Sequence, residues 1–287
     1  MSLKEVKQRI LSVKNTQKIT SAMKLVSAAK LRRAQSAIEG VRPYRQKLDE
    51  MLLSYLSAAD SVAAPYTRSG ELHRVAVVAV SSNSSLCGSF NASVIRLAKE
   101  VIDRYSSMPG VAVEVYPVGK KVFDSLQKEG CNINAALMSQ AGAPDYSDVA
   151  TVAHELMNRF LAGEIDKIEL VYSHFYSAAK QMPVREVFLP VDLKSMQGGA
   201  ASAADYIVEP GKEALVKALL PKVITLRLYA ALLDSVAAEH AARMLAMQIA
   251  TDNADDLITE LVREYNKSRQ QAITNELLDI VSGSSAG

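Results

Sequence analysis

The feature that most constrains the fold is a pair of long helix-forming stretches at opposite ends of the 287-residue chain. Residues 3–58 contain a single proline, Pro43, and a single glycine, Gly40, among good helix formers. A helical period returns after residue 211 and lasts to about residue 282. At 1.5 Å rise per residue, the two helices would reach about 80 Å and about 100 Å, beyond the diameter of any domain this chain could form.

The spacing of apolar residues predicts how these helices pack. Leu3, Val6, Ile10 and Val13 lie three, four and three residues apart, which is the seam of a coiled coil. The C-terminal stretch repeats a similar spacing through Leu233, Val236, His240, Met247, Ala254, Ile258, Leu261 and Tyr265. The most economical arrangement is an antiparallel coiled coil in which each helix buries the seam of the other. Because the N-terminal helix is shorter, residues 265–287 should extend past it and either meet another protein or fray.

The middle of the N-terminal helix has an unusually small seam. From residue 15 to 37 the large apolar residues of the seam are replaced by Ala, Ser, Thr and charged residues. Small residues allow close helix packing, so we expect a slim stalk here that is exposed to a surrounding structure. In the C-terminal helix, His240 is expected to be a buried polar residue that sets the register. Asp252, Asp255 and Asp256 are expected to form a solvated face rather than a cation site.

Between the helical ends, the pattern changes to short apolar runs that alternate with helical stretches. Strands are predicted at 74–80, 111–118, 167–175 and 184–191, and helices at 92–105, 120–128 and 146–162. Residues 60–70 are predicted to be a linker and 197–204 a flexible loop. The predicted fold is α/β: a long antiparallel coiled coil of the N- and C-terminal helices plus a small Rossmann-like α/β domain. The corresponding parts are 1–60, 72–195 and 210–287.

The net charge of +2 conceals an asymmetry along the chain. Residues 1–47 hold 12 basic and two acidic residues, whereas residues 212–287 hold eight basic and ten acidic residues. One end is therefore a strongly basic arm. A composition of 49% apolar and 22% charged residues excludes wholesale disorder.

Several classes of protein and site are not supported. No run approaches 18 apolar residues, as a membrane span would need, and the N-terminus lacks the layout of a signal peptide, so we expect it to be mature structure. The two cysteines, Cys87 and Cys131, lie 44 residues apart without metal-ligand companions, which argues against a disulfide framework or a zinc site and favours a reducing compartment. His154 and Glu155 lack the second histidine of a zinc helix and are expected to be a surface pair.

The loop at 81–91 follows the first strand, where an open α/β sheet normally binds a ligand. Its Ser, Asn and Gly residues suit a phosphate cradle, and Cys87 could be a nucleophile. However, the loop has one glycine and no Gly-Lys-Ser/Thr, so a packed turn with an inert cysteine is favoured. An α/β phosphate-binding enzyme remains an alternative.

The basic run Lys24, Lys30, Arg32 and Arg33 has three interpretations. It could bind phosphates as a nucleic-acid-binding coiled-coil arm, form a solvated face, or meet acidic protein loops. The run lacks interleaved aromatic residues and any known reader motif, so nucleic acid is disfavoured.

Both ends of the chain resemble the gamma subunits of F-type ATP synthases of the bacterial type. At the N-terminus the similar runs are Ser2–Ile10 and Lys14–Gln35; at the C-terminus they are Glu239–Met247, Ala250–Ala254, Tyr265–Gln270, Ile273–Leu277 and Ile280–Gly283. The middle departs from the family, which usually has Ser-Asp-Arg-Gly-Leu-Cys-Gly-Gly where this chain has Ser-Asn-Ser-Ser-Leu-Cys-Gly-Ser at 82–89. The cysteine insertion of chloroplast relatives is absent.

The resemblance implies a central-stalk rotor that couples ring rotation to ATP synthesis or hydrolysis on beta subunits. It implies no catalytic site and no cofactor in this chain, and alpha, beta and epsilon subunits and the membrane c-ring as partners, with no nucleic acid. It also implies a peripheral location on the cytoplasmic face of the bacterial inner membrane. Exposed ion pairs of about 0–1 kcal/mol would suit contacts that break at each step. The rotor–stator contacts implied by the matched motifs are Met23, Lys24, Arg243, Arg269, Gln270, Thr274 and Glu276.

Overall fold

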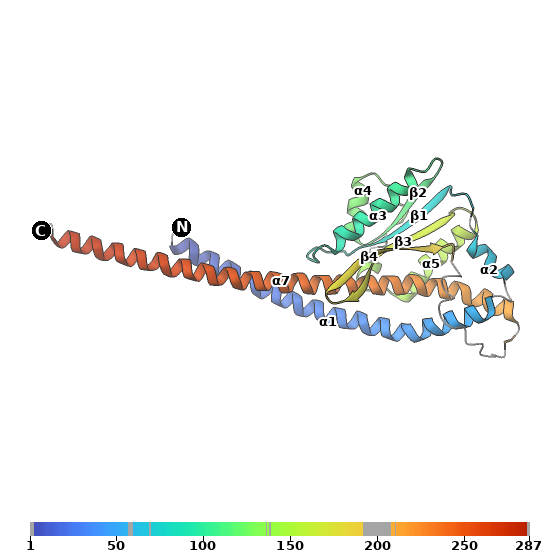
Figure 1. The fold of residues 1–287 in the computed structure, drawn as a ribbon, viewed down its shortest axis with the longest axis horizontal. Helices are drawn as coiled ribbons and strands as arrows, with labels where there is room; N and C mark the ends of the chain where they lie inside the picture. The colour runs from blue at the N-terminus through green and yellow to red at the C-terminus, as the bar shows by residue number, and fades with distance from the viewer. Residues whose placement is uncertain are drawn as a thin grey trace. The chain divides into compact units, whose positions relative to one another are not determined.

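The structure, a computed structural model, describes residues 3–56, 60–68, 70–135, 137, 139–191, 208–209 and 211–285 (Figure 1). The predicted loop at 197–204 lies outside these residues. The chain divides into two compact units, one of residues 1–27 with 243–287 and one of residues 28–242. Helices α1 (Leu3–Leu56) and α7 (Lys212–Ser285) each contribute to both units. We call the first unit the helix pair and the second the sheet domain.

In the helix pair, the predicted seam is confirmed. Val6 is fully buried, and Leu3, Ile10 and Val13 are half-buried. The same spacing of three and four continues through polar residues that are buried or half-buried, namely Gln17, Thr20, Lys24 and Ser27. The heptad period is therefore maintained after the apolar residues end.

The two helices of this pair are antiparallel, as predicted. Gln17 contacts Asp255, Thr20 contacts Thr251 and Lys24 contacts Gln248. On this register Leu3 lies opposite about residue 269. Figure 1 shows α7 continuing past the N-terminal end of α1, and the described side chains at 273–281 are exposed.

The sheet domain has four strands in the order β2-β1-β3-β4. Strand β1 (Arg74–Val80) is parallel to β2 (Ala112–Val118) and to β3 (Lys167–Ser177), whereas β4 (Lys180–Leu189) is antiparallel to β3. Only residues 178 and 179 separate β3 from β4, and such a short connection permits a hairpin but not a parallel crossover. The sheet is thus mixed rather than wholly parallel.

Helices cover both faces of the sheet (Figure 1). Val75, Val77 and Ala79 of β1 share a core with α3 (Phe90–Ser106) and α4 (Lys120–Lys128). The alternate residues Ala76, Val78 and Val80 share a core with α5 (Tyr146–Leu161) and with parts of α1 and α7. Burial on both faces explains why β1 is a continuous apolar run.

One predicted element was wrong, and several had different ends. The expected linker at 60–70 contains helix α2 (Asp60–Thr67), in which Ala63 is 2% exposed and belongs to the core. Val62 and Tyr66 pack half-buried against the same core, so tertiary contacts accompany this helix although Pro65 lies within it. Strand β4 begins four residues before its predicted start because its pairing with β3 extends to Ser177 and Lys180. The division of the chain at 1–60, 72–195 and 210–287 stays a prediction.

Candidate functional site

The helix pair contains three consecutive polar layers in its seam. The Gln17 Nε2 atom donates to Asp255 Oδ1, and the Lys24 Nζ atom donates to Gln248 Oε1. Between them, the hydroxyls of Thr20 and Thr251 lie 2.8 Å apart. Polar layers in a coiled-coil seam specify register at a cost in stability. The seam thus fixes how the two helices align while keeping their contact narrow.

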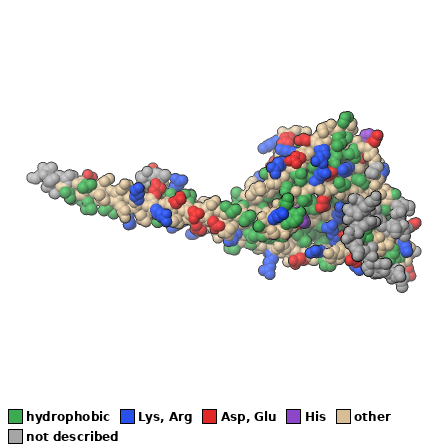
Figure 2. Space-filling model, viewed as in Figure 1, with side chains coloured by type: hydrophobic (Ala, Val, Ile, Leu, Met, Phe, Trp, Pro, Cys, Tyr) green, Lys and Arg blue, Asp and Glu red, His purple; other side chains and the backbone are tan. Residues whose placement is uncertain are grey.

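The charge of residues 1–27, the first part of the basic arm, is largely balanced within the helix pair, whereas Lys30, Arg32 and Arg33 belong to the sheet domain. Residues 1–27 hold six basic residues and one acidic residue, and residues 243–287 hold four basic and seven acidic residues, which leaves a net charge of +2. Figure 2 shows both signs of charge interspersed along this pair. On this face of the helix pair the charges are therefore mixed, unlike the single-sign stripe expected of a nucleic-acid-binding arm.

The seven predicted contact residues fall into two groups within the helix pair. Met23 and Lys24 are half-buried in α1, and Arg243 is 8% exposed in α7. The residue that faces Lys24 is Gln248, which the sequence analysis did not single out. The second group, near the end of α7, is exposed and comprises Arg269, Gln270, Thr274 and Glu276.

The sequence analysis missed the large apolar side chains that the helix pair exposes. In α1 they are Leu11, Ile19, Leu25 and Val26, and in α7 they are Leu245, Ile249, Val262, Ile273, Leu277, Leu278, Ile280 and Val281. Exposed apolar residues that gather in this way indicate a surface for another protein. The available signal was the run of apolar residues after Tyr265, which continues past the reach of α1.

Side chains of the loop at 81–91 occupy the position that a bound phosphate would take. Asn83 Oδ1 accepts a hydrogen bond from the Lys120 backbone N–H at 2.9 Å, and Ser81 Oγ accepts one from the Val122 N–H at 2.9 Å. These are amides at the start of α4 that a bound phosphate would otherwise use. The Cys87 side chain is 1% exposed, and Asn91 Nδ2 donates to its Sγ atom at 3.1 Å. The geometry therefore agrees with a packed turn and an inert cysteine.

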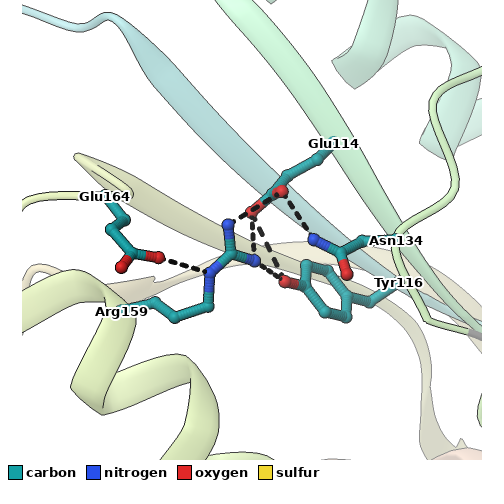
Figure 3. Close-up of polar contacts among 5 residues, drawn as sticks. All are labelled: Glu114, Tyr116, Asn134, Arg159 and Glu164. Carbon is teal, nitrogen blue, oxygen red and sulfur yellow. Dashed lines mark hydrogen bonds and ion pairs between the residues drawn. The ribbon is translucent and has the colours of Figure 1, made fainter.

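A charged cluster joins α5 to strand β2 (Figure 3). The guanidinium of Arg159 lies 2.9 Å from Glu114 and 3.1 Å from Glu164, and it donates to the hydroxyl of Tyr116. Asn134 Nδ2 donates to Glu114 at 2.9 Å. Burial would lower the pKa of Arg159, but its hydrogen bonds to Glu114 and Glu164 outweigh this effect and raise it.

The Tyr116 hydroxyl in this cluster is not prepared for acid–base chemistry. Burial and the neighbouring Glu114 charge raise its pKa to about 12, so it stays protonated near neutral pH. The carboxylate of Glu114 is engaged by Arg159 and Asn134. We interpret the cluster as a structural connection between α5 and the sheet.

The residues considered as possible metal ligands are placed as the sequence analysis expected. His154 and Glu155 are exposed on α5, and Asp252, Asp255 and Asp256 are exposed on α7. Within the described part of the chain, no group of three His, Cys, Asp or Glu side chains could hold a metal ion. In the same described residues, every helix is too short or too polar to cross a membrane.

Comparison with known proteins gives matches over the whole chain. A family model described as ATP synthase matches residues 2–286. The ATP synthase gamma chain of Phocaeicola vulgatus is 50% identical over 287 residues, which cover 99% of each chain. The ATP synthase gamma chain of Flavobacterium johnsoniae is 46% identical and covers 99% of this chain and 98% of the relative.

Solved structures share the fold at lower sequence identity. A chain of the mitochondrial ATP synthase of Euglena gracilis, in a structure of OSCP, F1 and c-ring, aligns with a TM-score of 0.67 and 22% identity. The alignment covers 99% of this chain and 94% of that chain. A chain of the central stalk and c-ring of Tetrahymena thermophila mitochondrial ATP synthase aligns with a TM-score of 0.58 and 24% identity.

Proposed function

The chain belongs to the ATP synthase gamma-chain family, and from this premise we propose that it is the central-stalk rotor of an F-type ATP synthase. The observation that carries the proposal is the 50% identity to a gamma chain over the full length of both proteins. Neither alternative function has comparable support. Residues 1–27 of the basic arm are offset by acidic residues of α7, which leaves a net charge of +2 on the helix pair, and side chains of the loop at 81–91 bind the amides that a phosphate would use.

The proposed mechanism assigns force transmission, rather than chemistry, to this chain. ATP would be made or hydrolysed on beta subunits, and the helix pair would turn within a ring of alpha and beta subunits. The three polar layers between α1 and α7 would hold the two helices in one register during rotation. The sheet domain would bind the epsilon subunit and the c-ring at the cytoplasmic face of the membrane.

We place the contacts with the ring on two surfaces of the helix pair. The exposed apolar side chains at 273–281 would lie against the inner wall of the ring, where burial of each would stabilise the complex. Charged and polar contacts would add weak, reversible attraction. The residues assigned to these contacts are Met23, Lys24, Arg243, Arg269, Gln270, Thr274 and Glu276.

Cross-linking in the assembled enzyme tests this assignment. In a Cys131→Ser background, Leu277→Cys is labelled with a photoactivatable maleimide, and we expect illumination to join the chain to alpha or beta subunits and to stop ATP hydrolysis. The control is Arg104→Cys on the exposed end of α3, which should give no product with alpha or beta. A Leu277→Cys product that leaves turnover unchanged would contradict rotation.

Two further measurements test whether this chain transmits force while the beta subunits carry out the ATP chemistry. The purified chain alone should not hydrolyse ATP, and enzyme-like hydrolysis by it would refute the proposal. In the assembled enzyme, Arg269→Ala should reduce the protons pumped per ATP hydrolysed more than Arg263→Ala, which removes another exposed arginine from the same helix. Equal effects of the two variants would argue against a specific contact at Arg269.

A further inference from the structure

The sheet domain contains a cleft that none of the seven contact residues assigned above lines, which we call the arginine cleft. It has a volume of about 520 Å³ and lies between α1, the β3–β4 hairpin and α7. Arg42 and Arg45 line it from α1, Arg227 lines it from α7, and Glu186 and Asp234 line it from β4 and α7. Its charged groups therefore come from segments far apart in the sequence.

The two acidic side chains of the cleft already have donors. The Tyr172 hydroxyl donates to Glu186 at 2.8 Å. The Phe175 backbone N–H donates to Asp234 at 3.1 Å, and His174 Nδ1 contacts the same carboxylate. Both carboxylates are thus held next to the hairpin by donors other than the arginines.

The arginines of the cleft are less well compensated. Among the described residues, no carboxylate lies within 4.0 Å of the guanidinium of Arg42 or of Arg227, and Arg45 approaches Asp49 only to 3.6 Å. Burial and the neighbouring Arg45 charge lower the pKa of Arg227, although the charges of Glu186 and Asp49 act in the opposite direction. The cleft thus offers guanidinium donors that a ligand could use.

We propose that the arginine cleft binds a nucleoside phosphate, with Arg227, Arg42 and Arg45 holding the phosphate oxygens. A guanidinium presents its donors in a planar fork that matches the oxygens of a phosphate group. The volume falls within the range of small-molecule sites. This proposal is independent of the rotor function.

The other wall of the cleft explains why an organic phosphate fits better than the inorganic ion. Ile38, Val41 and Phe175 line it together with Ala230, Ala231 and Leu233, so six of the thirteen lining residues carry no polar side-chain atom. A pocket with an apolar wall and a few convergent polar groups is typical of sites for ligands with a ring system. The planar base of a nucleotide would lie against this wall.

A bound nucleotide would connect α1, the β3–β4 hairpin and α7. Because it would bind the folded chain and not the unfolded chain, it should raise the midpoint of thermal unfolding. The experiment therefore measures binding and unfolding with the full-length purified chain, using ADP as the probe and EDTA to remove divalent ions. Calorimetric titration should give a dissociation constant of about 1 mM or tighter. Adenosine and inorganic phosphate should each bind more weakly than ADP.

Matched variants identify the site. Arg227→Gln should weaken ADP binding about tenfold or more, because hydrogen bonds to charged groups are stronger than neutral ones. Arg104→Gln, which removes an exposed arginine of α3, should leave binding unchanged. If Arg227→Gln does not fold, Arg42→Gln on the surface of α1 provides the same test. The proposal is overturned if ADP does not bind, if the Arg104 variant loses as much affinity as the cleft variants, or if succinate binds as tightly as ADP.

Discussion

The middle of the helix-pair seam and the core of the sheet domain bury different kinds of side chain. The domain places aromatic and branched residues such as Phe160, Ile168 and Leu228 at 2% exposure or less. The seam of the helix pair between residues 17 and 27 is instead made of Gln, Thr, Lys and Ser. Large apolar side chains of the pair lie on its outside, where Ile19 is 60% exposed and Ile280 is 67% exposed.

This difference indicates that the sheet domain is stabilised mainly by its own core, whereas the helix pair presents a surface for contact with other proteins. Burying a large apolar side chain contributes about 1.5–3 kcal/mol, so the domain has a strong internal source of stability. The helix pair gains less from its narrow seam and leaves apolar surface uncovered. A stalk that turns inside a ring of subunits would have these properties.

The largest expected effect comes from the domain core. Phe160→Ala should lower the free energy of unfolding by about 3–5 kcal/mol, since Phe160 is fully buried and the change leaves a cavity. Urea unfolding followed by circular dichroism measures this change. The matched variant on the helix pair, Ile19→Ala, should change stability by less than about 0.5 kcal/mol. Equal losses of stability in Phe160→Ala and Ile19→Ala would contradict the proposed difference between the two units.

The second effect concerns the backbone of the domain. Gly119 has a φ of +99°, and a Cβ atom there would lie 2.3 Å from the Ser81 carbonyl oxygen. Gly119→Ala should therefore lower the free energy of unfolding by about 2–3 kcal/mol. The control is Gly130→Ala, because Gly130 has a φ of +72° but no atom near its Cβ position. This variant introduces backbone strain without a close contact, and it should lower the free energy of unfolding by about 1 kcal/mol. Urea unfolding measures both changes. Equal losses of stability in the two variants would contradict the predicted effect of the close contact at Gly119.

A smaller effect should depend on pH. Burial would raise the pKa of Asp166, but the backbone N–H groups of Arg74 and His73, at 2.8 and 2.7 Å, outweigh it and lower the pKa. Because the folded-state pKa is depressed, this stabilisation is complete above the unfolded pKa of about 3.9 and is lost as pH falls through the folded value.

Asp166→Asn should therefore cost about 1 kcal/mol at neutral pH, and the difference from the unmodified chain should shrink in acid. Urea unfolding at a series of pH values measures this. Asp256→Asn, at an exposed site of the helix pair, should cost less than about 0.5 kcal/mol. A deficit in Asp166→Asn that stays constant into acid would argue against the pKa shift.

The smallest effect is expected within the seam of the helix pair. Thr20→Val and Thr251→Val should each cost about 0.5–1 kcal/mol, since each hydroxyl also lies within hydrogen-bond distance of a carbonyl of its own helix, at 3.0 and 2.8 Å, and only one of the two can donate to the other. The double variant should cost less than the sum of the two single changes, because it leaves no polar partner buried alone. Thermal unfolding of the four chains measures the coupling. Strictly additive losses would show that the two threonines do not interact.

Local patterns predicted the elements well where short-range spacing decides the structure. The seam of Leu3, Val6, Ile10 and Val13 is confirmed because a helical face is set by neighbours three and four residues apart. Helix α4 has the predicted bounds, 120–128. Helix α2 was missed because Ala63, Val62 and Tyr66 pack against a core formed by distant segments, whereas the local signal of Pro65 disfavours a helix.

The candidate site was predicted less completely. Motifs at the two ends led to the family and to seven proposed contact residues, whose roles stay predictions. The exposed apolar side chains at 273–281 were not among the predicted contact residues, although the shorter N-terminal helix had predicted that residues 265–287 extend past it. The arginine cleft could not be found in the sequence, because Arg45 and Arg227 are separated by most of the sheet domain.

By itself, the sequence determined that two long helices flank one α/β domain, that β1 is buried on both faces, and that the chain resembles the gamma-subunit family. Periodicity and motifs carry this information because they depend on residues close together in the chain. Only the tertiary structure decided that β4 runs antiparallel to β3, that Lys24 faces Gln248, and that three arginines meet at one cleft. These contacts form between segments that are distant in the sequence. They depend on how those segments pack when the whole core is buried.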